Sequence, residues 1–368
     1  MSLRWDIFCR VVDNYGDIGV CWRLARQLAT EHAASVRLWV DDLGSFARLC
    51  PQLDPAAAQQ MLAGIDVRHW GADVAVNEVG EVVIEAFACE LPASALAAMR
   101  TRSTPPVWIN LEYLSAEDWV EGCHQLASPQ AGGLKKHFFF PGFSAATGGL
   151  LGERAMRAAR AAWTEADAVQ HLQAYGALPE GALRVSLFAY ENAAIARLLD
   201  AWAYGSRDVM CYLPEGRLLP QVAAWAGRAL AAGNMVQQGR LALHVLPLLD
   251  QDGYDRLLWS CHVNFVRGED SFVRAQWAAR PMVWHIYRQE EGAHLIKLEA
   301  FLARYGAGPA SDALMQAWND EADVALAWQA ALASLPQLQA HAERWAQQQA
   351  SHNDLAGNLV SFVKTLLK

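Results

Sequence analysis

The stretch Trp5-Asp-Ile-Phe-Cys-Arg-Val-Val12, followed by Asp13-Asn-Tyr-Gly-Asp-Ile-Gly19, decides the fold. The first eight residues have the apolar character of a buried strand, and the next seven form a loop with two glycines. Apolar residues at helical spacing then predict a helix over Val20–Thr30, and Ser35–Val40 predicts a second strand. This order of strand, loop, helix and strand is typical of the start of a doubly wound parallel sheet.

The alternation of strands and helices occurs in two consecutive series. The first continues with predicted strands at Ile65–His69, Val82–Phe87 and Pro106–Leu111. The second begins at Arg184–Tyr190 and ends at Pro281–Ile286. Two series of similar size predict an α/β fold of two Rossmann-like domains that face each other across a cleft, the GT-B-type arrangement of one large class of glycosyltransferases.

The boundaries of these domains follow from the same pattern. We expect a first domain over residues 1–152, a helical connector over 153–180, a second domain over 181–346, and C-terminal helices, about 347–368, that cross back to the first domain. Within them we expect an irregular, aromatic and glycine-rich segment over Glu112–Gly149, one helical stretch over Glu153–Tyr175, and a helix over Leu218–Ala232.

Composition excludes several classes of protein. The 368 residues are 53% hydrophobic and 19% charged, which suits two large cores, and the net charge is −9. Without a Lys/Arg block, we expect no nucleic-acid partner. No apolar run reaches the ~20 residues of a membrane span, so we expect no membrane partner. The seven cysteines are scattered without a C-x-x-C pair, which predicts reduced thiols and a cytoplasmic location.

The segment Arg267-Gly-Glu-Asp-Ser-Phe-Val-Arg-Ala-Gln-Trp277 follows the apolar run Val263–Val266. A strand, a glycine turn and a helix start form a site for phosphate, because the first turn of a helix has free N–H groups. Glu269 and Asp270 would repel phosphate unless they bind sugar hydroxyls, so the segment predicts a nucleotide-sugar site. The alternative, that Asp270 and Ser271 serve only as helix caps, has equal weight on this pattern alone.

Asp13 and Asp17 lie four residues apart in the first glycine loop. One interpretation is a general base with a neighbour that orients it or sets its pKa. The other is turn chemistry, in which Asp17 caps the following helix. The loop matches neither a G-x-G-x-x-G fingerprint nor a P-loop, so a dehydrogenase or an ATPase is disfavoured.

Three further side chains are candidates for the second-domain site. Phe188 and Tyr190 end a predicted strand, and Gln251 lies in a loop that could hold a base. Ordinary strand packing explains the two aromatic residues about equally well. The acidic pairs Asp41-Asp42 and Asp250/Asp252 are typical of solvated turns, so we expect no metal site and no cofactor.

Four motifs together resemble the family of bacterial protein-arginine rhamnosyltransferases that modify translation elongation factor P. They are Asp13–Gly19, His137-Phe-Phe-Phe-Pro-Gly-Phe143, Ser186-Leu-Phe-Ala-Tyr-Glu191 and Arg267–Trp277. The resemblance runs the whole chain in the same order. One residue departs from it: His262 stands where an acidic residue is expected, and it precedes the predicted strand.

The resemblance implies an inverting, metal-independent enzyme that transfers L-rhamnose from dTDP-β-L-rhamnose to one arginine of elongation factor P. The modified factor would then rescue ribosomes stalled at proline runs. The implied catalytic residues are Asp17 as general base, Asp13 and Glu269; the implied donor-binding residues are Phe188, Tyr190, Gln251, Arg267, Glu269, Asp270 and Ser271; and the implied acceptor-side loop is Asn14, Tyr15 and Gly16.

Two alternatives remain at this point. One is a nucleotide-sugar transferase of the same architecture with a small-molecule or lipid acceptor. The other is a protein that binds a nucleotide-sugar without catalysis. Donor turnover separates catalysis from binding, and the identity of the acceptor separates the two transferases.

Overall fold

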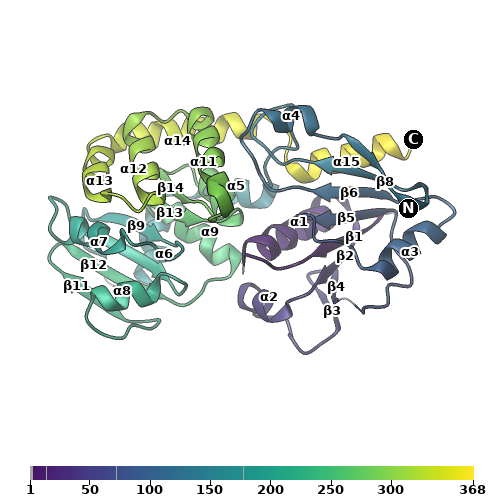
Figure 1. Ribbon diagram of the computed structural model, residues 1–368. Coiled ribbons are helices and arrows are strands. Elements are labelled where there is room, and N and C mark those ends of the chain that lie inside the picture. The colour runs from purple at the N-terminus through teal and green to yellow at the C-terminus, as the bar shows by residue number, and fades with distance from the viewer. Residues whose placement is uncertain (1–2, 14, 72, 177) are drawn as a thin grey trace. The chain divides into compact units, whose positions relative to one another are not determined.

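The computed structural model describes residues 3–13, 15–71, 73–176 and 178–368 (Figure 1). The chain divides into two compact units. The first unit consists of Met1–Met156 and Gln349–Lys368, and the second of Arg157–Gln348. Both are α/β units built on a mainly parallel sheet, as predicted.

The described part of the first unit contains an eight-stranded sheet with the order β3-β4-β2-β1-β5-β6-β8-β7. All neighbours pair in parallel except the two edge strands β3 and β7, which pair antiparallel. The strands are β1 (Arg4–Cys9), β2 (Ser35–Val40), β3 (Gln59–Leu62), β4 (Ile65–His69), β5 (Val82–Ala86), β6 (Val107–Leu111), β7 (Ala127–Pro129) and β8 (Lys135–Phe139). The central strands are apolar and buried on both faces, as a parallel sheet covered by helices requires.

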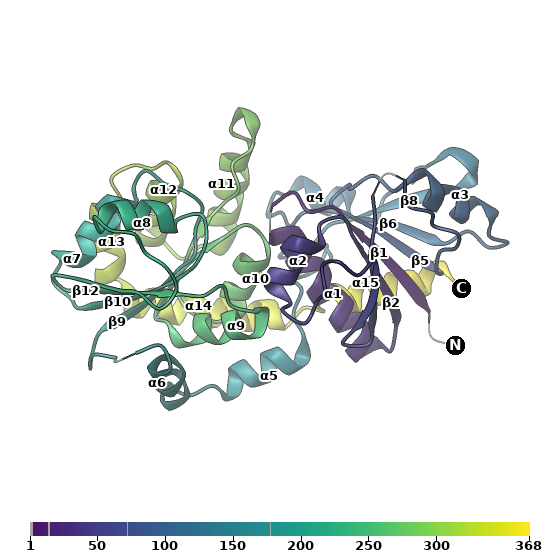
Figure 2. The same cartoon turned by 90° about the horizontal axis from the view of Figure 1, so that it is seen from below.

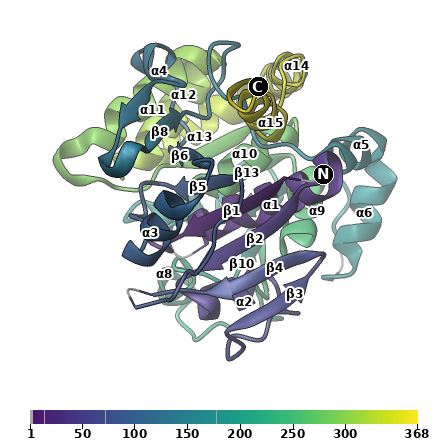
Figure 3. The same ribbon diagram turned by 90° about the vertical axis from the view of Figure 1, so that its right-hand side faces the viewer.

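Helices cover both faces of this sheet. They are α1 (Gly16–His32), α2 (Leu43–Leu49), α3 (Ala93–Thr101), α4 (Trp119–Cys123) and α15 (Leu355–Leu366), with a 3₁₀ turn at Ala131–Gly133. One core joins α1 and α15 to the sheet, and Leu355, Leu359 and Val363 of α15 are buried in it (Figure 2). Helix α3 lies on the other face (Figure 3), where its Met99 belongs to one core with Phe8 and Trp39.

Two predictions for the first unit need correction. The segment over Glu112–Gly149 is not wholly irregular, since it contains α4, β7 and β8. His137 and the following phenylalanines belong partly to β8, whose parallel pairing with β6 extends the sheet. The aromatic and glycine content of this segment hid short elements that depend on pairing with β6. The first helix also begins earlier than predicted, at Gly16.

The described part of the second unit contains a six-stranded sheet with the order β11-β12-β10-β9-β13-β14. Its pairings are parallel except that of β11 with β12. The strands are β9 (Leu183–Leu187), β10 (Val209–Pro214), β11 (Met235–Gln238), β12 (Leu241–Leu246), β13 (Val263–Arg267) and β14 (Met282–His285).

The helices of the second unit form layers on both faces of its sheet. They are α5 (Arg154–Ala162), α6 (Glu165–Gln173), α7 (Ile195–Ala203), α8 (Leu219–Trp225), α9 (Gln251–Ser260), α10 (Asp270–Trp277), α11 (Ala293–Tyr305), α12 (Pro309–Asn319), α13 (Val324–Ala333) and α14 (Leu335–Ala350), with a 3₁₀ turn at Glu290–Gly292. Helices α7, α12 and α13 pack together on one side (Figure 1), while α6, α9 and α10 pack on the other.

Two helix predictions for the second unit also need correction. The single stretch over Glu153–Tyr175 is two helices, because Thr164 and Asp167 form a capping box that starts α6. Helix α8 ends at Trp225 rather than at Ala232, and Gly227 just beyond it has a positive φ of 65°. A residue in the left-handed region ends a helix, and glycine adopts it without strain.

The seven cysteines are free thiols, and six of them are buried. In the part of the chain that the structure describes, no helix combines the length and apolar character needed to cross a membrane.

Candidate functional site

The carboxyl end of β1 is a topological switch point. Strand β1 pairs with β2 on one side and with β5 on the other. The order in which the chain adds strands to the sheet therefore changes side at β1. Ligands of open α/β sheets bind at such points. The loop from Arg10 into α1 crosses this edge, and it carries the predicted residues Asp13 and Asp17.

Asp17 is buried, at 2% exposure, in the first turn of α1. Its Oδ2 accepts hydrogen bonds from the backbone N–H groups of Val12 at 2.8 Å and Asp13 at 2.9 Å. Its Oδ1 accepts one from the hydroxyl of Tyr113 at 3.1 Å. These contacts run to the loop before the helix, so the interpretation of Asp17 as a cap of α1 is wrong.

The pKa of the Asp17 carboxyl is raised. Burial is the largest cause, and the negative charge of Asp13 adds to it. The hydrogen bonds from Asp13, Val12 and Tyr113 act in the opposite direction, because they stabilise the ionised form. A carboxylate in this environment is a better proton acceptor than one in water, which is the property a general base needs.

The rest of the loop predicted to lie on the acceptor side is tightly packed. The carbonyl of Asp13 accepts the N–H of Gly16 at 2.6 Å, and a Cβ at Gly16 would lie 2.9 Å from Asp13 Oδ2. Only glycine therefore fits there without displacing Asp13. The Tyr15 side chain makes no helix-capping hydrogen bond, and the guanidinium of Arg48 lies 5.8 Å from its ring. Asn14 lies outside the described residues.

The second switch point lies at the carboxyl end of β9. Strand β9 is flanked by β10 on one side and β13 on the other. Phe188 and Tyr190 directly follow β9, and Gly268 and Glu269 directly follow β13. The residues predicted to bind the donor therefore converge on one edge of one sheet, although 79 positions of sequence separate Phe188 from Arg267.

Arg267 joins the two aromatic candidates. Its guanidinium carbon lies 4.6 Å from the centre of the Phe188 ring and 4.7 Å from that of Tyr190. Arg267 and Tyr190 are buried, with exposed fractions of 4% and 7%, and Phe188 is half-buried. Cation–π contacts at these distances orient both rings and leave a positive charge at the switch point.

The turn after β13 has the geometry predicted for a helix-start site. Gly268 has a positive φ of 59°, and α10 begins at Asp270. Glu269 occupies the N-cap position, but its side chain makes no capping hydrogen bond. The Glu269 carboxylate therefore does not cap α10.

The side chain of Ser271 is hydrogen-bonded within its own turn. Its hydroxyl accepts the N–H of Arg267 at 2.9 Å and donates back to the Arg267 carbonyl. The side chain thus closes the turn, and the backbone N–H of Ser271 lies in the first turn of α10, where N–H groups can donate to an anion.

Gln251 begins α9 rather than lying in a loop, because Asp250 caps this helix by accepting the N–H of Gly253 at 2.7 Å. The Gln251 amide donates to Asp270 Oδ2 at 3.3 Å, which ties α9 to the motif after β13. The ring of Tyr254, one turn further along α9, lies 5.5 Å from that of Phe188.

The buried pair of Arg274 and Asp255 fixes α10 against α9. The guanidinium donates to both carboxylate oxygens, at 3.0 and 2.7 Å, and both residues are almost fully buried. This bidentate pair sets the position of the motif helix.

Sequence reasoning missed three residues at these edges. Tyr113 and Phe87 follow β6 and β5, and their rings stack at 4.4 Å. His285 ends β14 with its ring 5.3 Å from that of Tyr190, and burial lowers its pKa to about 3. The available signal was position alone, since each lies at or just after the carboxyl end of a parallel strand.

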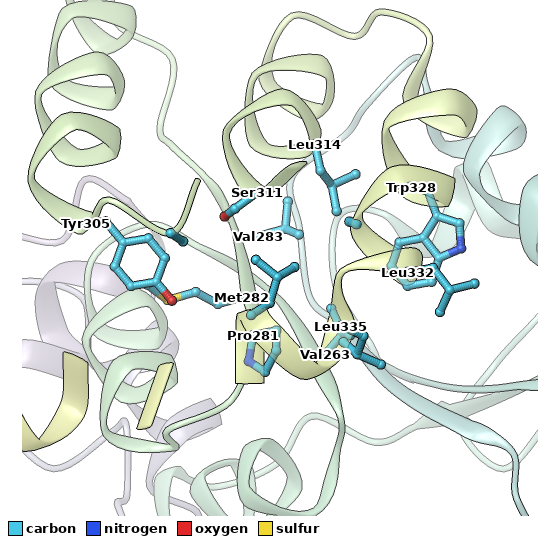
Figure 4. Close-up of a pocket in the computed structure, with 13 residues that line it drawn as sticks. Val263, Pro281, Met282, Val283, Tyr305, Ser311, Leu314, Trp328, Leu332 and Leu335 are labelled. Carbon is cyan, nitrogen blue, oxygen red and sulfur yellow. The ribbon is translucent and has the colours of Figure 1, made fainter. Parts of the chain in front are cut away.

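The acidic pairs and one apolar cavity lie outside the two switch points. Among the described residues no group of three His, Cys, Asp or Glu side chains is arranged to hold a metal. Asp42 and Asp250 cap helices α2 and α9. An apolar cavity of about 20 Å³ near Pro281 and Val263 lies at the amino ends of β14 and β13 (Figure 4). It is at the wrong edge of the sheet and is too small for a nucleotide.

Comparison with known proteins identifies relatives that match nearly the whole chain. The family described as "Elongation-Factor P (EF-P) rhamnosyltransferase EarP" matches residues 5–364. A protein-arginine rhamnosyltransferase of Pseudomonas putida is 53% identical over 377 residues, covering 100% of each chain. The solved structure described as "Structural basis for EarP-mediated arginine glycosylation of translation elongation factor EF-P" has a TM-score of 0.71 at 38% identity and covers 99% of each chain.

A more distant likeness bears on the architecture. The structure of the glycosyltransferase VinC in complex with dTDP has a TM-score of 0.52 at 12% identity and covers 98% of each chain. At that identity the likeness shows the fold alone, which is the two-domain GT-B type. The match over nearly the whole length and the high identity to curated relatives lead to one conclusion: this chain belongs to the EarP family of elongation factor P rhamnosyltransferases.

Proposed function

We propose that this chain transfers L-rhamnose from dTDP-β-L-rhamnose to an arginine side chain of translation elongation factor P, with inversion at the sugar carbon. The observation that carries the proposal is the 53% identity over the whole chain to a protein-arginine rhamnosyltransferase. The buried Asp17 carboxylate at the first switch point supports it independently, because arginine is an acceptor that needs such a group.

Arginine is a poor nucleophile because its lone pairs are delocalised and its pKa is above ~12. A catalyst must orient the guanidinium and remove a proton as the new bond forms. Asp17 is suited to this, since Val12 and Asp13 fix one of its oxygens and burial raises its pKa. In the proposed step an arginine nitrogen attacks C1 of the sugar, and Asp17 accepts the proton that this nitrogen loses.

The leaving group needs stabilisation at the same moment. The bond between C1 and the diphosphate oxygen breaks, and dTDP departs with the electron pair. The N–H groups and dipole of α10, together with the Arg267 guanidinium, would stabilise that negative charge without a metal. Glu269 and Asp270 would accept hydrogen bonds from donor hydroxyls, while Phe188, Tyr190 and Gln251 would seat the nucleotide. A single displacement of this kind inverts the configuration at C1.

The product would be a rhamnosylated factor that is active at polyproline stalls. Because a translation elongation factor works on ribosomes, the proposal includes a cytoplasmic location for the enzyme. It includes no cofactor beyond the donor substrate.

Intact-mass measurement tests the proposal. Elongation factor P is incubated with enzyme and dTDP-β-L-rhamnose, and we expect a gain of one deoxyhexosyl group. A factor whose acceptor arginine is replaced by lysine is the control and should gain nothing. Donor hydrolysis without mass gain would indicate another acceptor, and no donor turnover would indicate a binding protein. The configuration of the product at C1, read by NMR, tests inversion.

A further inference from the structure

Tyr113 is in direct contact with the candidate base. It lies two residues after β6, and its hydroxyl donates to Asp17 Oδ1 at 3.1 Å. The backbone of Val12 and Asp13 holds the other oxygen of the same carboxylate. Tyr113 is 36% exposed, so it stands between the buried carboxylate and the surface from which an acceptor side chain must approach.

The ring of Tyr113 is held by a neighbouring strained loop. Phe87 stacks on it with ring centres 4.4 Å apart and an angle of 16° between the planes. Phe87 has a positive φ of 55°, and Ala88 and Glu90 in the same loop have values of 53° and 56°. Non-glycine residues in the left-handed region cost of order 1 kcal/mol or more each, and they persist where the surroundings impose them.

Hydrogen bonds from neighbouring strands impose this conformation. The Phe87 N–H donates to the Leu111 carbonyl at 2.7 Å, and the Ala88 N–H donates to Asn110 Oδ1 at 3.2 Å. Because Leu111 and Asn110 belong to β6, the strand that precedes Tyr113 also fixes the loop that carries Phe87. The strained backbone therefore places the Phe87 ring against Tyr113.

We propose that Tyr113 is a positioning residue for Asp17, and that Phe87 in its strained loop positions Tyr113, so that Oδ1 of the base is oriented toward the acceptor nitrogen. The inference rests on the proposed function and adds to it a part of the base's machinery in the first unit. Tyr113 and Phe87 act through Asp17 and need not touch the sugar.

The charges around Asp17 predict the direction of the effect. Asp13 faces it from the loop, the Cys9 thiol from β1, and Asp41, after β2, also acts on Cys9. Burial raises the pKa of Asp17, and the Tyr113 hydroxyl is one of the groups that lower it. Removal of that hydroxyl should raise the pKa further, which protonates the base at a higher pH.

The test is Tyr113→Phe, which keeps the stacked ring and removes only the hydroxyl. A hydrogen bond to a charged group corresponds to about ten- to a hundredfold, so we expect kcat for transfer to fall by that factor. The acid limb of the kcat–pH profile should move to higher pH, while dTDP affinity stays unchanged. Phe87→Leu should move the same limb in the same direction by a smaller amount.

Tyr204→Phe is the matched control, because Tyr204 belongs to the second unit, is 71% exposed, and accepts a hydrogen bond from the Gln238 amide through its hydroxyl at 2.8 Å. It should leave kcat and the pH profile unchanged. Wild-type kcat in Tyr113→Phe would overturn the inference, and so would a lower kcat with an unmoved acid limb. If the wild-type enzyme modifies no arginine, the proposed function itself fails, which is a different result.

Discussion

Replacement of Asp17 by asparagine separates the chemistry of this residue from its structural contacts. An amide oxygen in the place of Oδ2 still accepts the N–H groups of Val12 and Asp13, now 2.8 and 2.9 Å away. The amide nitrogen would then face the Tyr113 hydroxyl, which can rotate to accept. The loop should therefore keep its conformation, and only the proton acceptor is lost. General-base catalysis contributes about 10²–10⁴-fold, so kcat should fall by that factor while dTDP affinity stays near that of the wild type.

The same substitution has a predicted sign on stability. The folded pKa of Asp17 is raised above its unfolded value, chiefly by burial. Such a group stabilises the fold fully below the unfolded pKa of about 3.9, and this stability is lost as pH rises through the folded pKa. At neutral pH the asparagine variant should therefore melt at the same temperature as the wild type or higher. The difference should shrink as the pH approaches the ordinary carboxyl range.

Asp42→Asn is the matched control. Asp42 also accepts a backbone N–H, from Ser45 at 2.9 Å, but its pKa is lowered by its bonds with Ser45. Its replacement should leave transfer intact and should lower the melting temperature slightly at neutral pH. Calorimetry of dTDP binding, a transfer assay and thermal melting at two pH values complete the experiment. Wild-type transfer by Asp17→Asn would refute the base assignment, and a much lower melting point at neutral pH would refute the account of its burial.

Three other predictions concern the second unit and the metal. Arg274→Ala should lower the free energy of unfolding by about 3–5 kcal/mol, because it removes both guanidinium contacts from the buried Asp255 carboxylate. Urea unfolding should show a smaller loss in the double variant with Asp255→Ala than the sum of the two single losses. The pKa of His262 is lowered to about 4, first by burial and then by Arg184 and Arg280, so wild-type stability should fall as pH drops from about 6.5 toward 4. In His262→Asn, which keeps an acceptor for the Arg184 N–H, the fall in unfolding free energy over that range should be smaller by up to about 3 kcal/mol. Transfer should persist in excess EDTA, and activity lost to the chelator but restored by magnesium or manganese would contradict the metal-free mechanism.

Periodicity and turn chemistry predict the central strands well, because each is a short apolar run between loop residues. Ser35–Val40 and Ile65–His69 are strands with the bounds that the sequence pattern indicates. The edge strands β3, β7 and β11 escape this reasoning. They are half exposed and have mixed composition, and only their pairing partners make them strands.

The residues of the candidate site also differ in whether the sequence alone reveals them. Residues within a motif, such as Asp17 or Glu269, are visible as a local pattern of strand, turn and helix. Tyr113 and Phe87 are not visible in this way, because the stacking of their rings and the hydrogen bond from Tyr113 to Asp17 depend on the parallel pairing of β5 with β6 and of β5 with β1. Ser271 lies within a motif that the sequence reveals, but its hydroxyl accepts a hydrogen bond from the Arg267 N–H of the same turn. Sequence finds the segments of a site, and sheet topology decides which side chains meet.

Glu269 provides the sharpest test of the donor assignment. It follows Gly268 at the carboxyl end of β13 and is half-buried, and it makes no capping hydrogen bond to α10. A carboxylate beside a diphosphate is unfavourable unless it accepts hydrogen bonds from hydroxyls of the donor. Such bonds contribute roughly 1.5–3 kcal/mol, so Glu269→Ala should weaken binding of dTDP or dTDP-rhamnose about ten- to a hundredfold. Because no capping bond is lost, the melting temperature should change little. Glu343→Ala, on the exposed face of α14, is the control and should change neither quantity. A Glu269→Ala variant with wild-type affinity and a lowered melting point would show that this carboxylate serves the helix, and the donor hydroxyls would then have to be bound by other residues at the β9–β13 edge.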